Sequence, residues 1–575
     1  MLIVLLNWLY IFITTYITGQ TILILFNRLS GNRTGYGFLS AMISGFAFVT
    51  VFSGYFSLFR RVGPEVNILL IIICILDILL FRKDHFRVLQ EGFRFLKTRY
   101  QIKILREAGA LILFFVIIYF SAYGEFHSDS GLYHAQSIRW IEEYGVVKGL
   151  GLLQNRFGYN SAFFSVSALY SFAFLGQSLH CVNGFMAALV TIYAWYELTF
   201  SIYSKKHGLH ILADAAPVLY TFVGGIELIS PTTDPILLYL FFAIAMLWCR
   251  GIERDDTDVS YYSLLCVLTC FLVSVKLSVG VLVLLVLQPA VVLIKEKRIG
   301  EIIVCILSGI ISVLPYFIRS VIITGWLIYP SSTPDLFSYP WKIPVESIEH
   351  DAAEITTWAR YVRDTDRLND SILEWAPVWW EGQTTLDRFL SFVAIASFIT
   401  GLLWCVSAAG RLIKNNKKDP SPFLCRLLFL EIVMLLGFLF WFLSAPLIRY
   451  GYLYLLLLPL ITCGVMIYDK GVQLPLKGLF AILMILFMLY PIGSYVIKDA
   501  GYIRDNWSRQ YAVFQKDYPE AEVKEKEYCG FSFYYPVDEG TPVWYKAFPS
   551  VLYEDNLDFM VPMGDSLEDG FMIRQ

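Results

Sequence analysis

Long apolar segments, separated by short polar connections, run through almost the whole chain. Most hold roughly 17 to 25 residues, which is enough for a helix to cross a hydrocarbon layer of about 30 Å. Helices are expected because lipid-exposed backbone is otherwise satisfied only in a closed barrel, whose strands are much shorter. The pattern predicts an all-α polytopic fold of about 14 transmembrane helices, over residues 3–26, 36–58, 66–81, 107–123, 183–203, 209–225, 234–250, 260–275, 278–294, 301–323, 386–409, 424–445, 450–468 and 478–497.

One further apolar segment, residues 161–175, decides the topology. If it crossed the membrane, the basic groups at 205–206, 295–298 and 411–418 would all face outward. If it does not cross, they share the cytoplasmic side with the most basic connection, and this distribution is the usual one. We therefore predict a juxtamembrane helix at 159–178. The first outer loop (124–182), the long outer loop (325–385) and the C-terminal tail are then extracytoplasmic.

Composition agrees with a membrane protein and excludes other classes. The chain has 575 residues, 57% of them hydrophobic and 16% charged, with a mean hydropathy of +0.60, outside the usual range of soluble domains. Its net charge of −3 gives no basic excess for nucleic acid. The ten cysteines form no C-x-x-C pair and are read as small core residues. We expect a transmembrane domain over 1–497 and a small extracytoplasmic cap over 498–575.

An acidic stretch, residues 125–134, follows directly on the predicted span 107–123. In an extended backbone Glu125, His127 and Asp129 point to one side, because side chains alternate. One interpretation is a carboxylate general base that activates a hydroxyl. A second is a polar loop that caps the following helix through residues 128–130. A third is a divalent metal near Glu125, His127 and Asp129, with His134, whose ligand types are suitable.

Another acid and three cations are predicted on the same side of the membrane. Asp234 begins the span 234–250, where the helix dipole favours an acid. Lys276 interrupts an apolar stretch, and Arg319 and Arg449 lie near the outer ends of their spans. Each cation alone is explained by snorkelling to the interface. Together the three can bind a phosphate or diphosphate.

With these features the chain resembles the GT-C glycosyltransferases, polytopic enzymes that use polyprenyl-phosphate-linked sugars and include the protein O-mannosyltransferases and lipid A aminoarabinose transferases. The resemblance rests on the acidic first loop with Tyr133-His134, the juxtamembrane helix, the acid Asp234 before a span, Lys276 after a long apolar helix, and Arg319 ahead of Gly325-Trp326-Leu327-Ile328-Tyr329-Pro330. Many of these enzymes carry adjacent Asp-Glu in the first loop, where this chain has His-x-Asp. Glu125 therefore remains an alternative base.

Within that group the chain is similar to an uncharacterised bacterial family associated with surface polysaccharide loci. This likeness spans nearly the whole chain and lies in residues 127–151, 341–344, Arg449-Tyr450-Gly451-Tyr452, Trp544, Phe548-Pro549 and Asp569-Gly570-Phe571.

The resemblance implies an inverting glycosyltransferase of the bacterial inner membrane, with its active site and C-terminal tail on the periplasmic side. It would move a sugar from an undecaprenyl-phosphate or diphosphate carrier to a glycan, lipid or protein acceptor. The implied catalytic residues are Asp129, Glu125 and Asp234, and the implied substrate-binding residues are His127, Tyr133, His134, Lys276, Arg319, Tyr329, Arg449, Tyr450, Trp379 and Trp380. The partners would be these substrates and membrane lipids. No cofactor is expected beyond the metal alternative.

Two other functions fit the same features. A polymerase or ligase for O-antigen or capsule polysaccharide needs the same cations and outer loops but uses a longer acceptor. A non-catalytic flippase or transporter of lipid-linked glycans would also be polytopic with buried charges. The placement of the unusual charges at one membrane face disfavours transport, because a transport path carries charges through the midplane.

Overall fold

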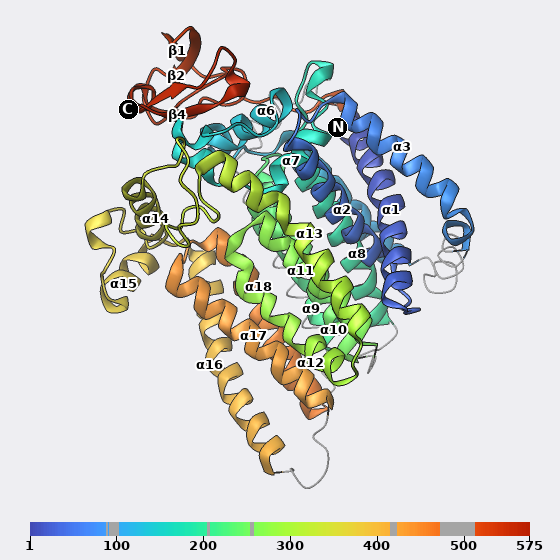
Figure 1. Cartoon of the computed structure of the whole chain (residues 1–575). Coiled ribbons are helices and arrows are strands. Elements are labelled where there is room, and N and C mark those ends of the chain that lie inside the picture. The colour runs from blue at the N-terminus through green and yellow to red at the C-terminus, as the bar shows by residue number, and fades with distance from the viewer. Residues whose placement is uncertain are drawn as a thin grey trace.

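The computed structural model describes residues 1–87, 90, 103–203, 208–253, 258–414, 422–471 and 512–574, and most of them are helical (Figure 1). Within these ranges eleven helical segments are long and apolar enough to cross a membrane, which confirms a multi-pass membrane protein. They are α1 (Leu2–Ser30), α2 (Phe38–Ser57), α5 (Ile104–Tyr123), α8 (Val182–Tyr203), α9 (Leu209–Gly224, continued by a turn to Glu227), α10 (Thr233–Glu253), the 3₁₀ segment Leu277–Val286 joined to α12 (Leu287–Lys295), α13 (Ile299–Thr324), α16 (Thr385–Lys414), α17 (Pro422–Ser444) and α18 (Ile448–Lys470).

Three of the fourteen predicted spans are not in this set. Two of them are helices of 17 residues, α3 (Pro64–Leu80) and α11 (Val259–Val275), each about 26 Å long at 1.5 Å per residue. The third, 478–497, and the predicted boundary between 497 and 498 lie outside the described residues.

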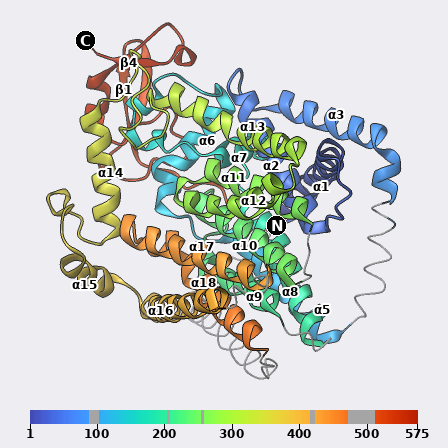
Figure 2. The same ribbon diagram turned by 60° about the horizontal axis from the view of Figure 1, so that its bottom comes forward.

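Helix α10 forms the centre of the bundle. Its apolar stretch is buried along its whole length, and α8, α9, α11 and α18 pack around it (Figure 2). The peripheral helices α13 and α16 instead expose side chains such as Ile310 and Phe392. In a membrane protein, such exposed apolar faces are those that contact lipid.

The segment 161–175, predicted not to span, is not among the helices long enough to cross a membrane. It forms α7 (Ala162–Tyr170), nine residues long, which is about 14 Å and half the thickness of the hydrocarbon layer. The Ser161 hydroxyl accepts from the Phe163 amide and donates to the Val275 carbonyl at 2.7 Å. This bond ties the start of α7 to the end of α11.

The first three helices support α7 from the other side. Helices α1 and α2 approach closely at Gly19 and Gly45, where a side chain would collide with the facing backbone; small residues permit such contacts between membrane helices. Asn7 of α1 and Asn67 of α3 donate to the carbonyls of Tyr170 and Leu169 at 2.8 and 3.0 Å. Buried amides thus fix the end of α7.

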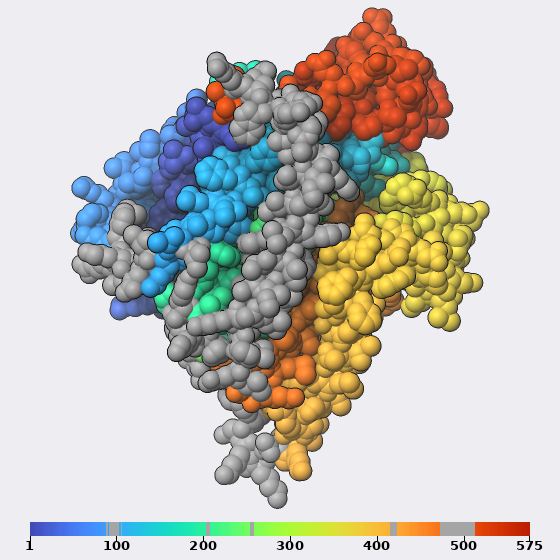
Figure 3. All heavy atoms as spheres, turned by 180° about the vertical axis from the view of Figure 1, so that it is seen from behind, coloured from blue at the N-terminus to red at the C-terminus, as the bar shows by residue number. Residues whose placement is uncertain are grey.

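The predicted outer elements lie together at one end of the bundle. They are α6 (Ala135–Glu143), the long-loop helices α14 (Val345–Ala359) and α15 (Ile372–Gly382), and the C-terminal cap (Figures 1 and 3). The cap departs from the all-α prediction, because it contains antiparallel pairs β1–β2 (Val523–Tyr528 with Phe531–Pro536) and β3–β4 (Met560–Pro562 with Phe571–Ile573). Trp140 of α6 packs in one apolar cluster with Phe533 and Phe571 of the cap.

Candidate functional site

The acidic stretch is held in place by the loop that precedes α10. The Glu125 amide donates to the Ile226 carbonyl at 3.0 Å, and the His127 amide donates to the Ser230 hydroxyl at 2.7 Å. After Asp129 the chain forms a π-helical turn (Ser130–His134) and continues into α6. The Asp129 side chain makes no capping hydrogen bond to this turn, so the capping interpretation does not hold for this residue.

Arg449, at the start of α18, connects the acidic stretch to the second predicted acid. Its Nη2 donates to Asp129 Oδ2 at 2.7 Å, and its Nε lies 3.7 Å from Asp234 Oδ2. Its Nη1 is 2.6 Å from His127 Nε2. One guanidinium therefore contacts three groups from two segments about a hundred residues apart in the sequence.

Lys276 adds a second cation to this cluster. It ends α11, and its ammonium forms an ion pair with Asp234. The same ammonium lies 3.5 Å from the centre of the Tyr450 ring, and the Arg449 guanidinium lies 5.1 Å from that ring. A cation near the face of an aromatic ring is attracted by the ring quadrupole, and Asp129 and Asp234 balance the charges of Arg449 and Lys276. The five residues Asp129, Asp234, Lys276, Arg449 and Tyr450 are called the ion cluster below.

The electrostatics of the cluster keep Asp129 ionised. Burial would raise the pKa of Asp129, but the Arg449 guanidinium and the two neighbouring histidines hold it well below the ordinary carboxyl range. Burial and Arg449 lower the pKa of His127, and burial lowers the pKa of His134 to about 3. Both imidazoles are therefore neutral at pH 7, beside an ionised carboxylate.

The metal interpretation finds no support in this arrangement. Glu125 is exposed, whereas His127 and Asp129 both face Arg449. Within the described ranges no three His, Cys, Asp or Glu side chains gather as ligands of one ion would. A guanidinium occupies the place where a divalent cation would have to contact Asp129 and His127.

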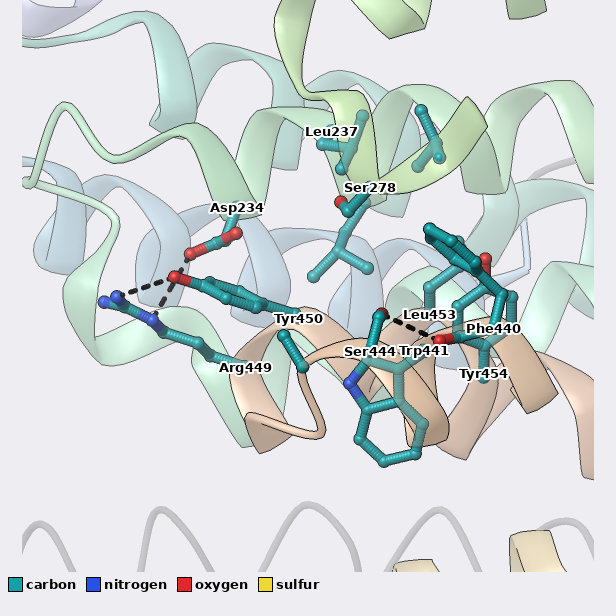
Figure 4. Close-up of a pocket in the computed structure, with 13 residues that line it drawn as sticks. Asp234, Leu237, Ser278, Phe440, Trp441, Ser444, Arg449, Tyr450, Leu453 and Tyr454 are labelled. Atoms are coloured by element: carbon teal, nitrogen blue, oxygen red, sulfur yellow. Dashed lines mark hydrogen bonds and ion pairs between the residues drawn. The ribbon is translucent and has the colours of Figure 1, made fainter. Parts of the chain in front are cut away.

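A pocket extends from the ion cluster into the helical bundle (Figure 4). Asp234, Arg449 and Tyr450 line one end of it. The rest is lined by Ser278 and Ser444 and by side chains that are mostly apolar: Leu237, Leu238, Val279, Phe440, Trp441, Ala445, Leu453 and Tyr454. These come from α10, the 3₁₀ segment, α17 and α18, and Phe440 is also exposed on the outside of the bundle. The pocket is therefore charged at one end and apolar along its length.

Two other predicted residues of the first loop lie next to the cluster. The Tyr133 ring packs 4.2 Å from the His134 ring, centre to centre. Asp129, Tyr450, Arg449 and Asp234 all act electrostatically on the Tyr133 hydroxyl, and burial together with the neighbouring charges raises its pKa. Tyr133 thus belongs to the wall of the site.

Three predicted binding residues have structural partners away from the ion cluster. Arg319 lines a different cavity, where it contacts Ser57 and Asn160. Tyr329 is buried and donates to Asp351 of α14 at 2.9 Å. Trp379 is only 2% exposed, and its indole N–H donates to the Pro446 carbonyl.

Trp379 and Trp380, both implied to bind substrate, are held by contacts within the protein. Trp379 packs against Trp441 and Phe442 of α17, so its ring faces are covered by protein. Trp380 is half-buried, and its carbonyl accepts from Arg388 at 3.0 Å. The position of Trp379 against Pro446 links α15 to the turn just before Arg449.

Glu227 is an acid of this site that the sequence reasoning missed. It lies in the turn after α9, near enough to Arg449, Asp234, Glu125 and Asp129 to act on them electrostatically. It is half-buried, and among the described residues no hydrogen bond or ion pair of its carboxylate is found. The sequence could have indicated this residue, because Glu227 directly follows an apolar span, as Glu125 does.

A second ionic group lies at the other end of α10. Arg250 donates to both carboxylate oxygens of Asp214 at 2.7 Å, and Glu197 lies 3.5 Å away. Asp214 is fully buried, and this bidentate pair joins α9 to α10. Because Arg250 already has carboxylate partners within the bundle, we interpret this group as structural.

The family comparison covers the whole of the ion cluster. Residues 1–456 match a family model described as Domain of unknown function (DUF8201). The matched part ends within α18, after Tyr450, and leaves the cap outside. No curated protein matches the chain.

Proposed function

We propose that this chain, which belongs to the DUF8201 family, is an integral-membrane glycosyltransferase of the GT-C type. It transfers a sugar from an undecaprenyl-phosphate or diphosphate carrier to a glycan, lipid or protein acceptor. The reaction takes place at the outer face of the bacterial inner membrane and inverts the sugar.

The observation that carries this proposal is the pocket with one charged and one apolar end. A polyprenyl-phosphate donor is itself charged at one end and apolar along its length. Arg449 and Lys276 suit the phosphate, because cations beside an aromatic ring in a partly buried site bind anions strongly. Phe440, Trp441 and Leu453 suit the isoprenoid chain, which would enter from the lipid side of α17.

Donor binding changes the partners within the ion cluster. Arg449 pairs with Asp129, and Lys276 pairs with Asp234. A phosphate that binds Arg449 and Lys276 competes with both carboxylates and weakens the bond between Arg449 and Asp129. The pKa of Asp129 then rises from its depressed value, which makes the carboxylate a better proton acceptor.

The transfer step follows from this arrangement. Asp129 takes the proton of the acceptor hydroxyl while the oxygen of that hydroxyl forms a bond to the anomeric carbon. The bond from that carbon to the carrier phosphate breaks, and its electron pair leaves on the phosphate oxygen. The new negative charge develops beside Arg449 and Lys276, where fixed cations stabilise the transition state more than the ground state.

The test is transfer in proteoliposomes that contain the purified protein, labelled undecaprenyl-phosphate-linked sugars and membrane acceptors. We expect donor-dependent sugar transfer that Asp129→Asn reduces by about 100-fold or more, the usual range for loss of a general base. Glu354→Gln, an exposed acid of α14, is the matched control and should retain full activity. Movement of intact lipid-linked sugar across the bilayer without release of free carrier phosphate would identify a flippase instead.

A further inference from the structure

Arg319 lines a small cavity at the junction of three segments. The cavity lies between α13, α6 with the loop that follows it, and the segment that leads into α7. Its lining combines apolar side chains with Ser137, Asn160 and Arg319. Arg319 is 3% exposed, and a guanidinium so far from water needs a compensating negative charge.

The protein partners of Arg319 are neutral. Its Nε donates to Asn160 Oδ1 at 3.0 Å, and its Nη1 donates to the Ser57 hydroxyl at 2.6 Å. Among the described residues no carboxylate forms an ion pair with it or acts on it electrostatically. The two bonds orient the guanidinium and leave its charge unbalanced.

The C-terminal end of α2 offers only partial compensation. A helix end carries roughly half a negative charge, and Ser57 is the last residue of α2. The terminal carbonyls are already occupied, however: Ser57 O accepts from Val146 N at 2.8 Å, and Phe56 O accepts from the amides of Phe59 and Arg60. Arg319 contacts the Ser57 hydroxyl and none of these carbonyls.

Two further side chains that line the cavity have donors without acceptors. Trp140 is fully buried, and its indole N–H finds no partner among the described residues. The hydroxyl of Ser137, also buried, finds none either. An indole N–H can only donate, and a buried donor without an acceptor is costly. The residues that line the cavity thus include one buried cation and two side chains with unused donors.

We propose that this cavity is a binding site for a single small anion of the halide class, with chloride as the physiological ligand. The volume open to the centre of a water-sized group is about 10 Å³, which holds one water or one monatomic ion and is too small for a phosphate. The anion balances Arg319 and accepts from Trp140 and Ser137. It thereby joins α13 to α6, the helix that directly follows the acidic stretch.

The experiment is thermal unfolding of the full chain in detergent, with chloride titrated against gluconate at constant ionic strength. Gluconate is too large for the cavity, so the wild type should melt at a higher temperature as chloride rises, with saturation. Arg319→Gln and Trp140→Phe should each remove this response. Arg61→Gln, which changes an exposed arginine paired with Glu65, should keep it.

A second measurement decides the matter if Arg319→Gln does not fold. Ser137→Ala and Trp140→Phe retain the guanidinium. Trp140→Phe should still remove the chloride response, and Ser137→Ala should reduce it. In crystals grown with bromide, an anomalous peak beside Arg319 is expected. Equal melting in chloride and gluconate, or a response that survives in both Trp140→Phe and Ser137→Ala, would show that the cavity holds only water and overturns the proposal.

Discussion

Arg449 Nη2 donates to Asp129 Oδ2 at 2.7 Å across 320 residues of sequence. The bond joins the start of α18 to the stretch between α5 and α6, and Arg449 continues from there to Asp234. The acid that we propose as base and the cation that we propose as phosphate ligand are thus each other's partners before substrate binds. Competition for Arg449 would couple donor binding to activation of Asp129.

Replacement of Arg449 by Gln should destabilise the protein as well as abolish donor binding. Asp129 and Asp234 would both lose their contact with the Arg449 cation, and we expect the free energy of unfolding to fall by about 2 kcal/mol. The removal of one partner from a fully buried ion pair costs more than this. The smaller value applies here because the Arg449 side chain is 28% exposed. Thermal unfolding measures the effect. The double variant Asp129→Asn/Arg449→Gln should be more stable than the sum of the single losses predicts, and strict additivity would show that the pair is not coupled.

Lys276→Ala should weaken binding of the donor while the fold is kept. A charge-assisted contact to phosphate contributes about 1.5–3 kcal/mol, so the affinity should fall by roughly 10- to 100-fold. Titration of the purified protein with a polyprenyl phosphate checks this. Lys546→Ala, in an exposed lysine of the cap, is the control. An unchanged affinity in Lys276→Ala would return that lysine to a purely structural role.

Glu227→Gln should strengthen donor binding. The Glu227 carboxylate repels an anionic phosphate bound by Arg449. Because the variant lacks this repulsion, the KM for the donor should be about 3- to 10-fold lower. The turnover number should stay nearly constant. A collapse of turnover with an unchanged KM would instead make Glu227 the proton acceptor and contradict the role given to Asp129.

Gly131→Ala should separate the cap from the acidic stretch. A methyl group on Gly131 would lie 2.6 Å from Pro542 Cβ and 2.7 Å from Trp544 Cδ2, so the cap would have to move. We expect a lower melting temperature and a large loss of transfer activity. Gly530→Ala is the control for activity, since a methyl group there would meet no atom within 4 Å. The positive φ of 84° at Gly530 strains an alanine by about 1–2 kcal/mol, so this variant should melt somewhat lower but keep its transfer activity.

Attachment of the cap should weaken as pH rises. Glu142 of α6 accepts from the Tyr545 hydroxyl at 2.5 Å, and burial raises its pKa to about 7. Because the folded pKa lies above the unfolded value, this contribution to stability is fully present below about pH 4.5 and is lost as pH rises through about 7, on the order of 3 kcal/mol. Unfolding measured between pH 5 and 8 should show this slope in the wild type and in Glu143→Gln, and a clearly smaller slope in Glu142→Gln.

The spans could be predicted because the free energy of transferring apolar residues to lipid depends on sequence alone. The charge distribution likewise identified α7 as non-spanning and grouped Asp129, Asp234, Lys276 and Arg449 at one end of the bundle. The charge distribution could not predict which charged side chains pair with one another, because the pairing depends on how each helix is rotated relative to its neighbours. Arg319 illustrates this limit, since α13 turns it toward Ser57 and away from Lys276.

Packing also explains why other parts of the structure differ from the sequence-based prediction. The resemblance implied that Trp379 binds substrate, but α15 folds back and buries this side chain against α17. Strand β2 could have been anticipated from the alternation in Phe531-Ser532-Phe533. Its partner β1 is nearly all charged or polar, which hides a strand from any reading based on hydropathy.

The attachment of the cap to Gly131 sets an order for the maturation of the protein. The amides of Val543 and Trp544 both donate to the Gly131 carbonyl at 3.0 Å, two residues after Asp129. A ribosome makes those amides about four hundred residues later than the carbonyl that they bind. The environment of Asp129 is therefore completed only after the segment around Trp544 has been synthesised and has reached the same side of the membrane, so a nascent chain still lacks the finished site while its helices are being inserted.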